Sequence, residues 1–331
     1  MKKNNIEKYS ANFSKEAKKI DAKLAKILDS KEPRSLYEPC GYILQSGGKH
    51  LRAYLVLLAA KVVGGSFSKA YNAALSVEIL HNFTLVHDDI MDSAEKRRGR
   101  DTLHIKYDIS TAILAGDSLI AVAYKYLLKD SKVNTLNILN TFNQSVLDIC
   151  EGQSLDKEFE IRSDVTIPEY KKMIQKKTAA LVEMCCSIGA QIGGGNKNEI
   201  KALEVFGKKL GLAFQLKDDL LDIMGDVKDF GKNVGGDLVE GKKTFLFLKA
   251  LEIAEGTDKL DLKKVVKNNG IRKNQINKYK KLYEKLNILE ITENEINKYT
   301  RVALKSLNNI KDSEGKENLK WLANSLMDRT K

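Results

Sequence analysis

The stretch 81–100, HNFTLVHDDIMDSAEKRRGR, sets the pattern on which this chain is organised. It ends an apolar helical run with Asp88, Asp89 and Asp92, and an arginine cluster follows within a turn or two. Acidic and basic side chains this close either neutralise one another or hold a metal ion and an anion together. The same D-D-x-x-D spacing recurs 130 residues later (218 − 88), at 218–222. This repetition favours a metal and anion site.

The composition predicts long helices. The chain has 331 residues but only 3 prolines and 22 glycines, and so few helix breakers disfavour a fold of short strands and turns. The length allows a sizeable core, and we find no internal linker or low-complexity segment. The four cysteines have no metal-ligand or disulfide spacing, and three of them lie in apolar helical contexts that are typical of buried thiols in a reducing compartment. We predict one all-α domain over 1–331.

The positive net charge predicts an anionic partner but does not by itself distinguish nucleic acid, a membrane surface and a phosphorylated small molecule. The net charge is +12, but most lysines are dispersed as on solvated helix faces, and a nucleic-acid module would interleave aromatic residues with its basic surface. The N-terminal segment MKKNNIEKYS lacks the apolar core of a signal peptide. No uncharged apolar run reaches the roughly 18–20 residues that span a bilayer. We predict a cytoplasmic protein with no transmembrane segment and no nucleic-acid partner.

Helical periodicity and breaker residues place the elements. A first helix is expected over 3–30, and a second begins after Pro33 and Pro39 and ends at Gly47-Gly48. Ser66 or Ser68 is expected to cap the helix that reaches the first aspartates. The further helices expected are 51–63, 109–129, 133–161, 166–192, 198–226, 244–255, 259–268, 272–288, 291–310 and 315–328. Residues 95–102 and 229–243 are expected to be loops, and no strand is predicted.

The aspartate segments have the donors that Mg²⁺ prefers. Asp88 and Asp92 are four residues apart, so they project from one helix face with Asp89 beside them. Three carboxylates within about one turn repel one another unless a cation lies among them, and oxygen-only donors suit Mg²⁺ shared with substrate phosphates. His87 points off this face and is left out of the ligand set. The same reasoning applies to the second segment, which contains Asp218, Asp219 and Asp222.

Basic residues near these carboxylates suit a diphosphate. Arg97 and Arg98 follow the first segment, and arginine binds phosphate oxygens in a bidentate manner. The segment 47–52, GGKHLR, adds two cations and glycine backbone at a helix start, although its spacing is not that of a P-loop. A diphosphate could therefore be bound from two sides, by Mg²⁺ on the carboxylates and by the arginine side chains.

Six motifs together carry a family resemblance. In chain order they are GGKxxR, HxxxLVHDDIMD, RRG, KT, FQxxDD and GKxxGGDxxxGKKT, spread over about residues 40–245. In this order they resemble the trans-isoprenyl diphosphate synthases, which include farnesyl and geranylgeranyl diphosphate synthases. The resemblance implies an isoprenoid synthase fold, an antiparallel helical bundle around a deep central cavity, usually as a homodimer. It also implies that both aspartate segments face the cavity and hold three Mg²⁺ ions.

The resemblance also implies roles for individual residues. The metal ligands would be Asp88 and Asp92 with Asp89, and Asp218 with Asp219 and Asp222. The contacts of isopentenyl diphosphate would be Lys49, Arg52, His81 and Arg98. The contacts of the allylic diphosphate would be Arg97, Lys177, Thr178, Gln215, Lys232 and Lys242. Of these, the catalytic set would be Asp88, Asp92, Arg97, Lys177, Thr178, Gln215 and Asp218. Two positions depart from the family pattern: His50 stands where Arg is common, and Ala53 where Pro is common.

The implied reaction is ionisation of an allylic diphosphate, attack by isopentenyl diphosphate, and proton loss to the departed diphosphate. Phe83, five residues before Asp88, with Thr84 after it, resembles the archaeal geranylgeranyl pattern and would limit product length. A farnesyl diphosphate synthase is the alternative product class. A class I terpene cyclase is disfavoured because FQLKDDLLD replaces its second metal motif, and a non-catalytic synthase subunit because both aspartate segments are intact.

Overall fold

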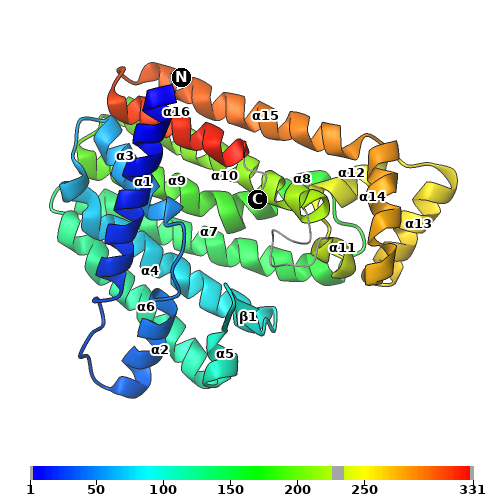
Figure 1. Ribbon diagram of the computed structural model, residues 1–331, viewed down its shortest axis with the longest axis horizontal. Coiled ribbons are helices and arrows are strands. Elements are labelled where there is room, and N and C mark those ends of the chain that lie inside the picture. Colours follow the sequence, from blue (N-terminus) through cyan, green and yellow to red (C-terminus); the bar gives the residue numbers. More distant parts are fainter. Residues whose placement is uncertain (1–2, 226–234, 329–331) are drawn as a thin grey trace. The chain divides into compact units, whose positions relative to one another are not determined.

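The fold is described by a computed structural model, which covers residues 3–225 and 235–328 of the chain. Most of this part is helical and almost none of it is sheet, which confirms the predicted all-α class (Figure 1). Contacts divide the chain into two compact units. Unit 1 comprises Met1–Phe142, Cys185–Leu203 and Asn309–Trp321. Unit 2 comprises Asn143–Met184, Glu204–Asn308 and Leu322–Lys331.

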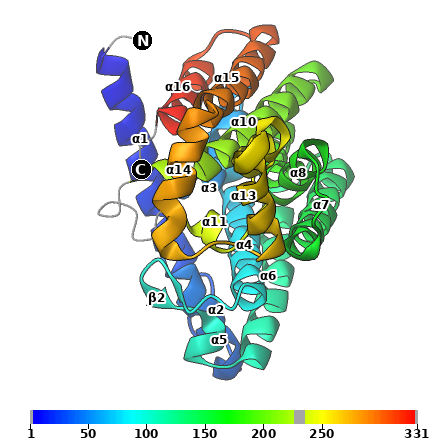
Figure 2. The ribbon, with the colours of Figure 1, turned by 90° about the vertical axis from the view of Figure 1, so that its right-hand side faces the viewer.

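Unit 1 is built on three helices that run side by side, α3, α4 and α6 (Figures 1 and 2). α3 spans Leu51–Val62, and its residues 53–60 are all buried, as their continuous apolar sequence predicts. α4 (Phe67–Met91) packs along α6 (Ile109–Asp130), and Gly116 allows the close approach. A Cβ atom at Gly116 would lie 2.3 Å from Nε2 of His87, so a larger residue would displace the His87 ring from this contact.

The remaining helices of unit 1 frame this core. The N-terminal helices are α1 (Lys3–Leu24) and α2 (Arg34–Leu44), and a single turn, α5 (Leu103–Lys106), precedes α6. The latter part of α9 (Ala180–Gly193) approaches α3 so closely that a Cβ at Gly189 would lie 2.3 Å from the carbonyl oxygen of Val56. Asn318 of α16 (Glu314–Met327) donates to the Tyr54 hydroxyl at 2.9 Å.

Unit 2 surrounds an apolar core that includes Leu216, Phe247, Leu262 and Tyr283. Its helices are most of α7 (Thr135–Ile161), α8 (Ile167–Ile174), much of α10 (Lys197–Met224), α11 (Gly236–Val239), α12 (Phe245–Ile253), α13 (Gly256–Lys267), α14 (Ile276–Lys285) and α15 (Ile288–Ser306). Figure 2 shows α13 and α14 side by side, where lysines of α14 pair with Asp261 and Asp258.

Most predicted helices are confirmed, and the structure differs from the prediction at three places in the N-terminal third of the chain. Pro39 does not precede the second helix but lies inside it, where burial of its ring offsets the one backbone hydrogen bond that it cannot donate. The first helix ends at Leu24 rather than at residue 30. The expected charged loop contains a short antiparallel hairpin, with Lys96–Arg97 paired to Arg100–Asp101.

The predicted helix 166–192 is interrupted by a π-helical turn. It begins as α8 with a capping box, in which Thr166 and Glu169 satisfy each other's backbone amides. The π-turn then covers Gln175–Ala179 before α9 continues the helix. This turn contains Lys177 and Thr178, two predicted site residues, and π-turns are frequent at functional positions.

Candidate active site

In unit 1, the first aspartate segment forms the C-terminal end of α4, where the helix dipole disfavours negative charge. Asp92 is the C-cap residue and is exposed, while Asp88 is half-buried. Asp89 points inward, is only 2% exposed, and accepts from Nε of Arg97 at 2.7 Å. Nη2 of Arg97 also lies 2.7 Å from Asp89 and 3.9 Å from Asp88. Arg97 therefore supplies positive charge that this helix end needs.

A hairpin positions the second arginine of the cluster. Arg98 and Gly99 form its two-residue turn with φ of 53° and 75°, the left-handed pair of a type I′ turn, which explains the glycine. The Arg98 guanidinium reaches back to donate to the Gly47 carbonyl. A Cβ atom at Gly48 would lie 3.0 Å from Nη1 of Arg98, so the glycine pair leaves room for the arginine.

Three of the four predicted isopentenyl diphosphate contacts, Arg52, His81 and Arg98, lie close together in unit 1. Nη1 of Arg52 lies 3.1 Å from Nε2 of His81. Burial, followed by the positive charges of Arg52 and Arg98, holds the pKa of His81 well below its usual range. His81 is therefore neutral, and its Nε2 accepts from Arg52. Lys49 is exposed, three residues before Arg52. The cluster is strongly cationic and suits an anion.

Phe83 lies on the side of α4 that faces α6. It is 7% exposed, and its ring centroid is 4.7 Å from that of His87, the side chain that packs against Gly116. Thr84 is half-buried and donates through Oγ1 to the His81 carbonyl at 2.8 Å. The two proposed chain-length residues are thus well packed within unit 1.

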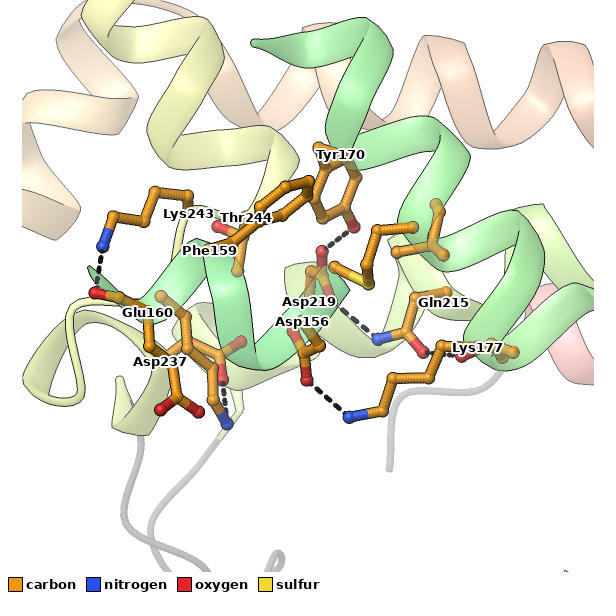
Figure 3. A pocket seen from close by; sticks show the side chains of 14 residues that line it. Asp156, Phe159, Glu160, Tyr170, Lys177, Gln215, Asp219, Asp237, Lys243 and Thr244 are labelled. Carbon is orange, nitrogen blue, oxygen red and sulfur yellow. Dashed lines mark hydrogen bonds and ion pairs between the residues drawn. The ribbon is translucent and has the colours of Figure 1, made fainter. Parts of the chain in front are cut away.

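In unit 2, the second aspartate segment lies in the last turns of α10. Asp219 is buried, and its carboxylate accepts from the Tyr170 hydroxyl and from Nε2 of Gln215, the latter at 2.9 Å (Figure 3). Burial, with the charge of Asp237, raises the pKa of Asp219 to about 8. Asp218 is half-buried on the same helix.

Asp222 connects α10 to the segment that begins at Gly235. Its Oδ2 accepts from the backbone amide of Asp237 at 3.1 Å, and burial with the Asp237 charge raises the pKa of Asp222 to about 6. Lys242 lies 3.6 Å from Asp237 and 2.8 Å from Glu240. Burial opposes the charge on Lys242, but Asp237 and Glu240 outweigh it and raise its pKa. Lys232 falls outside the described residues.

A cavity of about 130 Å³ brings several predicted residues together (Figure 3). Oγ1 of Thr178 donates to Oε1 of Gln215 at 2.8 Å, and the Gln215 amide in turn donates to Asp219. Lys177 forms an ion pair with Asp156 on α7. The cavity is lined by these residues and by Phe159, Glu160, Tyr170, Met173, Ile174, Asp237, Lys242, Lys243 and Thr244. The lining of this cavity therefore combines lysine side chains, the hydrogen-bonded series Thr178–Gln215–Asp219 and apolar side chains.

Sequence reasoning missed Tyr170, Asp156 and Gly152. Tyr170 gives no local signal, because its partner Asp219 is 49 residues away. Asp156 belongs to a helix whose sequence resembles an ordinary charged face. Gly152 did carry a signal, since a glycine inside a helix often marks a close backbone approach. A Cβ atom there would lie 2.1 Å from the Lys177 backbone nitrogen.

The carboxylate donors fit Mg²⁺. Over 3–225 and 235–328, no three carboxylate, His or Cys side chains converge as a ready-made metal centre would require. Mg²⁺ does not need such a centre, since it keeps several waters and usually takes one or two carboxylates plus substrate phosphates. Asp88 and Asp92, at the end of α4, offer oxygen ligands of this kind, as does Asp218 on α10.

An all-α chain with two aspartate-rich helix segments, each near arginine or lysine side chains, has the features of a helical enzyme that acts on diphosphates. Comparison with known proteins identifies the family. Residues 33–286 match the family described as polyprenyl synthetase. The chain therefore belongs to the polyprenyl synthetases, the trans-isoprenyl diphosphate synthases, and is a prenyltransferase.

Individual relatives agree with this assignment. The chain is 40% identical over 303 residues to a geranylgeranyl diphosphate synthase of Sulfolobus acidocaldarius, covering 89% of this chain and 91% of the relative. It is 38% identical over 315 residues to a geranylgeranyl pyrophosphate synthase of Geoglobus acetivorans, covering 95% and 97%. The crystal structure of a geranylgeranyl pyrophosphate synthetase from Pyrococcus horikoshii superimposes with a TM-score of 0.91 at 35% identity, covering 98% and 99%.

Proposed function

We propose that this chain condenses isopentenyl diphosphate with the allylic dimethylallyl, geranyl and farnesyl diphosphates to give geranylgeranyl diphosphate. The observation that carries the proposal is the cationic group Arg52, His81 and Arg98, built beside a carboxylate-rich helix end. An anion site next to potential Mg²⁺ ligands suits a diphosphate substrate. The relatives named geranylgeranyl diphosphate synthase support the C20 product.

Asp88, Asp92 and Asp218 are the proposed principal Mg²⁺ ligands, and three ions are expected per active site. Bound Mg²⁺ would stabilise the negative charge that develops on the leaving diphosphate. Asp89, Asp219 and Asp222 have protein partners in the structure and would support these ligands. Asp89 does so by holding Arg97, and Asp219 by holding Gln215.

The allylic diphosphate would be bound by Arg97, Lys177, Lys232 and Lys242, whose charges favour departure of the diphosphate. Because the Thr178 hydroxyl hydrogen is directed to Gln215, its oxygen lone pairs remain available to the allylic cation. Gln215 keeps this orientation because its amide is held by Asp219. The apolar part of the cavity wall, Phe159, Met173 and Ile174, would keep water from the cation.

Isopentenyl diphosphate would be held by Lys49, Arg52, His81 and Arg98. Neutral His81 accepts from Arg52, which fixes the guanidinium and leaves its other donors for phosphate oxygens. After the carbon–oxygen bond of the allylic diphosphate has broken, the double bond of bound isopentenyl diphosphate attacks the allylic cation. A proton then leaves for the departed diphosphate, so no protein base is required.

A homodimer is proposed from the outer face of α6. Ile109, Ile113, Leu114 and Leu128 are exposed along this helix, and a second copy of the chain would cover them. Among the described helices, α6 is the one that is long and apolar enough to cross a membrane by length and composition. Core and interface helices of soluble proteins meet the same criterion. We propose a cytoplasmic enzyme whose two units form one polyprenyl synthase domain.

The test is chain elongation by purified protein supplied with MgCl₂, isopentenyl diphosphate and each allylic starter in turn, with products sized after dephosphorylation. We expect geranylgeranyl diphosphate as the main product, with farnesyl diphosphate as the alternative outcome, and no activity after chelation of Mg²⁺. Asp88→Asn should reduce kcat by at least about 100-fold. The surface variant Glu252→Gln is the control and should behave as wild type. Absence of chain growth with every starter would refute the proposal.

A further inference from the structure

We infer that His50 is a positioning residue for the isopentenyl diphosphate site, where it bridges Asp21 and Glu78 and makes substrate binding depend on pH. The inference rests on the proposed function, because Lys49 and Arg52, the residues that it positions, are assigned to that substrate.

His50 is buried between two carboxylates of different helices. Its Nε2 lies 2.6 Å from Oδ1 of Asp21 on α1, and its Nδ1 lies 3.0 Å from Oε2 of Glu78 on α4. The His50 side chain is 3% exposed and that of Glu78 6%, whereas Asp21 is 46% exposed. Both ring nitrogens thus face a carboxylate oxygen. Only the doubly protonated imidazolium can donate to both.

The bridge is coupled to the start of α3. Oε1 of Glu78 accepts from the backbone amide of Ala53 in the first turn of α3 at 3.1 Å. The N-cap residue of α3 makes no such bond with its side chain, so the Glu78 carboxylate caps the helix instead. His50 itself has a φ of 48°, a left-handed conformation that is unusual outside glycine. Two charge-assisted hydrogen bonds hold it there, between Lys49 and the first turn that contains Arg52.

The charges around the bridge determine its response to pH. Burial disfavours the imidazolium, but Glu78 and Asp21 outweigh it and raise the pKa of His50. Burial also favours neutral Glu78, but His50, Arg52 and the Ala53 amide hold its pKa below the usual value. Arg98 on the hairpin adds positive potential near Glu78 and Asp21, whereas His81 on α4 is neutral. Glu78 therefore stays ionised while His50 titrates.

The sign of the effect follows. Below the raised pKa of His50 the bridge is complete, and above it one of the two hydrogen bonds loses its donor. The loop then loses an anchor, and Lys49 and Arg52 are held less firmly. The KM for isopentenyl diphosphate should rise at alkaline pH, while kcat at saturating substrate should change little. Arginine at this position would keep its charge throughout the range.

The experiment measures this KM at saturating geranyl diphosphate from about pH 6 to about pH 9, for wild type, His50→Arg and His50→Gln. At each pH the KM of a variant is divided by the KM of the wild type. This ratio removes the ionisations that all the proteins share, such as those of the substrate. The wild-type KM should rise by about three- to tenfold across the range, as expected for partial loss of one charge-assisted hydrogen bond. His50→Arg should stay flat, and His50→Gln should be high throughout.

An independent readout is the titration of His50 in spectra of histidine-labelled protein. The chain has four histidines, and the His50 signal is the one absent from His50→Arg. Asp21→Asn, which alters a half-exposed partner and retains Glu78, should lower the His50 pKa and move the KM rise to lower pH. This variant also keeps the test available if His50→Gln does not fold by circular dichroism.

Two results would overturn the inference: a KM that rises with pH in His50→Arg as it does in wild type, or an unchanged profile in Asp21→Asn. Failure of the proposed function looks different, since wild-type protein would then form no product at any pH. Product formation with identical pH profiles in all variants would refute the role of His50 alone.

Discussion

Gly152→Ala tests how strictly the backbone of α7 positions the π-turn that contains two of the proposed site residues. Gly152 lies where α7 passes the π-turn that contains Lys177 and Thr178. A Cβ atom at this position would lie 2.1 Å from the Lys177 backbone nitrogen and 2.6 Å from its Cα. Both obstacles are backbone atoms, which cannot rotate away as a flexible side chain would.

The size of the effect follows from the distances. Ordinary contacts of a Cβ atom begin at 3.4 Å, so α7 and the turn must separate by the difference, 1.3 Å, to restore an ordinary contact. Such a movement would break the 2.8 Å hydrogen bond from Thr178 to Gln215 and pull Lys177 from Asp156. Misplacement of reacting groups by about 1 Å costs roughly 100-fold in rate. Overpacking costs about 1–3 kcal/mol of stability.

The assay is steady-state chain elongation combined with thermal unfolding followed by circular dichroism. We expect kcat to fall by about 100-fold and Tm by about 2–10 °C. Gly41→Ala is the matched control, because Gly41 also lies inside a helix, but a Cβ atom there would meet only Nε2 of Gln45, at 4.0 Å. It should leave kcat unchanged and stabilise by about 0.5–1 kcal/mol. A Gly152→Ala enzyme with wild-type kcat and Tm would refute the reasoning.

Three further predictions address the rest of the site. Phe83→Ala should lengthen the product, because it removes a buried ring from the proposed end of the chain path; an unchanged product distribution by chromatography would exclude that role. Tyr170→Phe should lower kcat and cost about 1–3 kcal/mol of stability by removing a donor to buried Asp219, and unaltered unfolding and kinetics would contradict this. Leu114→Asp should convert a dimer to a monomer in light scattering, since Leu114 is 60% exposed on α6; an unchanged mass would place the interface elsewhere.

Local sequence rules predicted most of the helices. The apolar helix from Leu51 and the helix start at Thr166 both appear in the structure where expected, because caps and periodicity act within a few residues. Pro39 and the hairpin at 96–101 were missed for the opposite reason. Burial of a proline ring and the return of Arg98 to Gly47 depend on segments far away in the sequence.

The sequence by itself determined which chemistry this protein is suited to. The spacing of its aspartates indicates oxygen ligands for Mg²⁺, and the order of its six motifs indicates the family; both patterns can be recognised without the fold. Only the tertiary structure decided which of these side chains are paired. It directs Asp89 to Arg97, Asp219 to Tyr170 and Gln215, and His50 to Asp21 and Glu78. Most of these contacts join separate elements, and their strength comes from burial, which lowers the local dielectric and makes an unpaired charge costly.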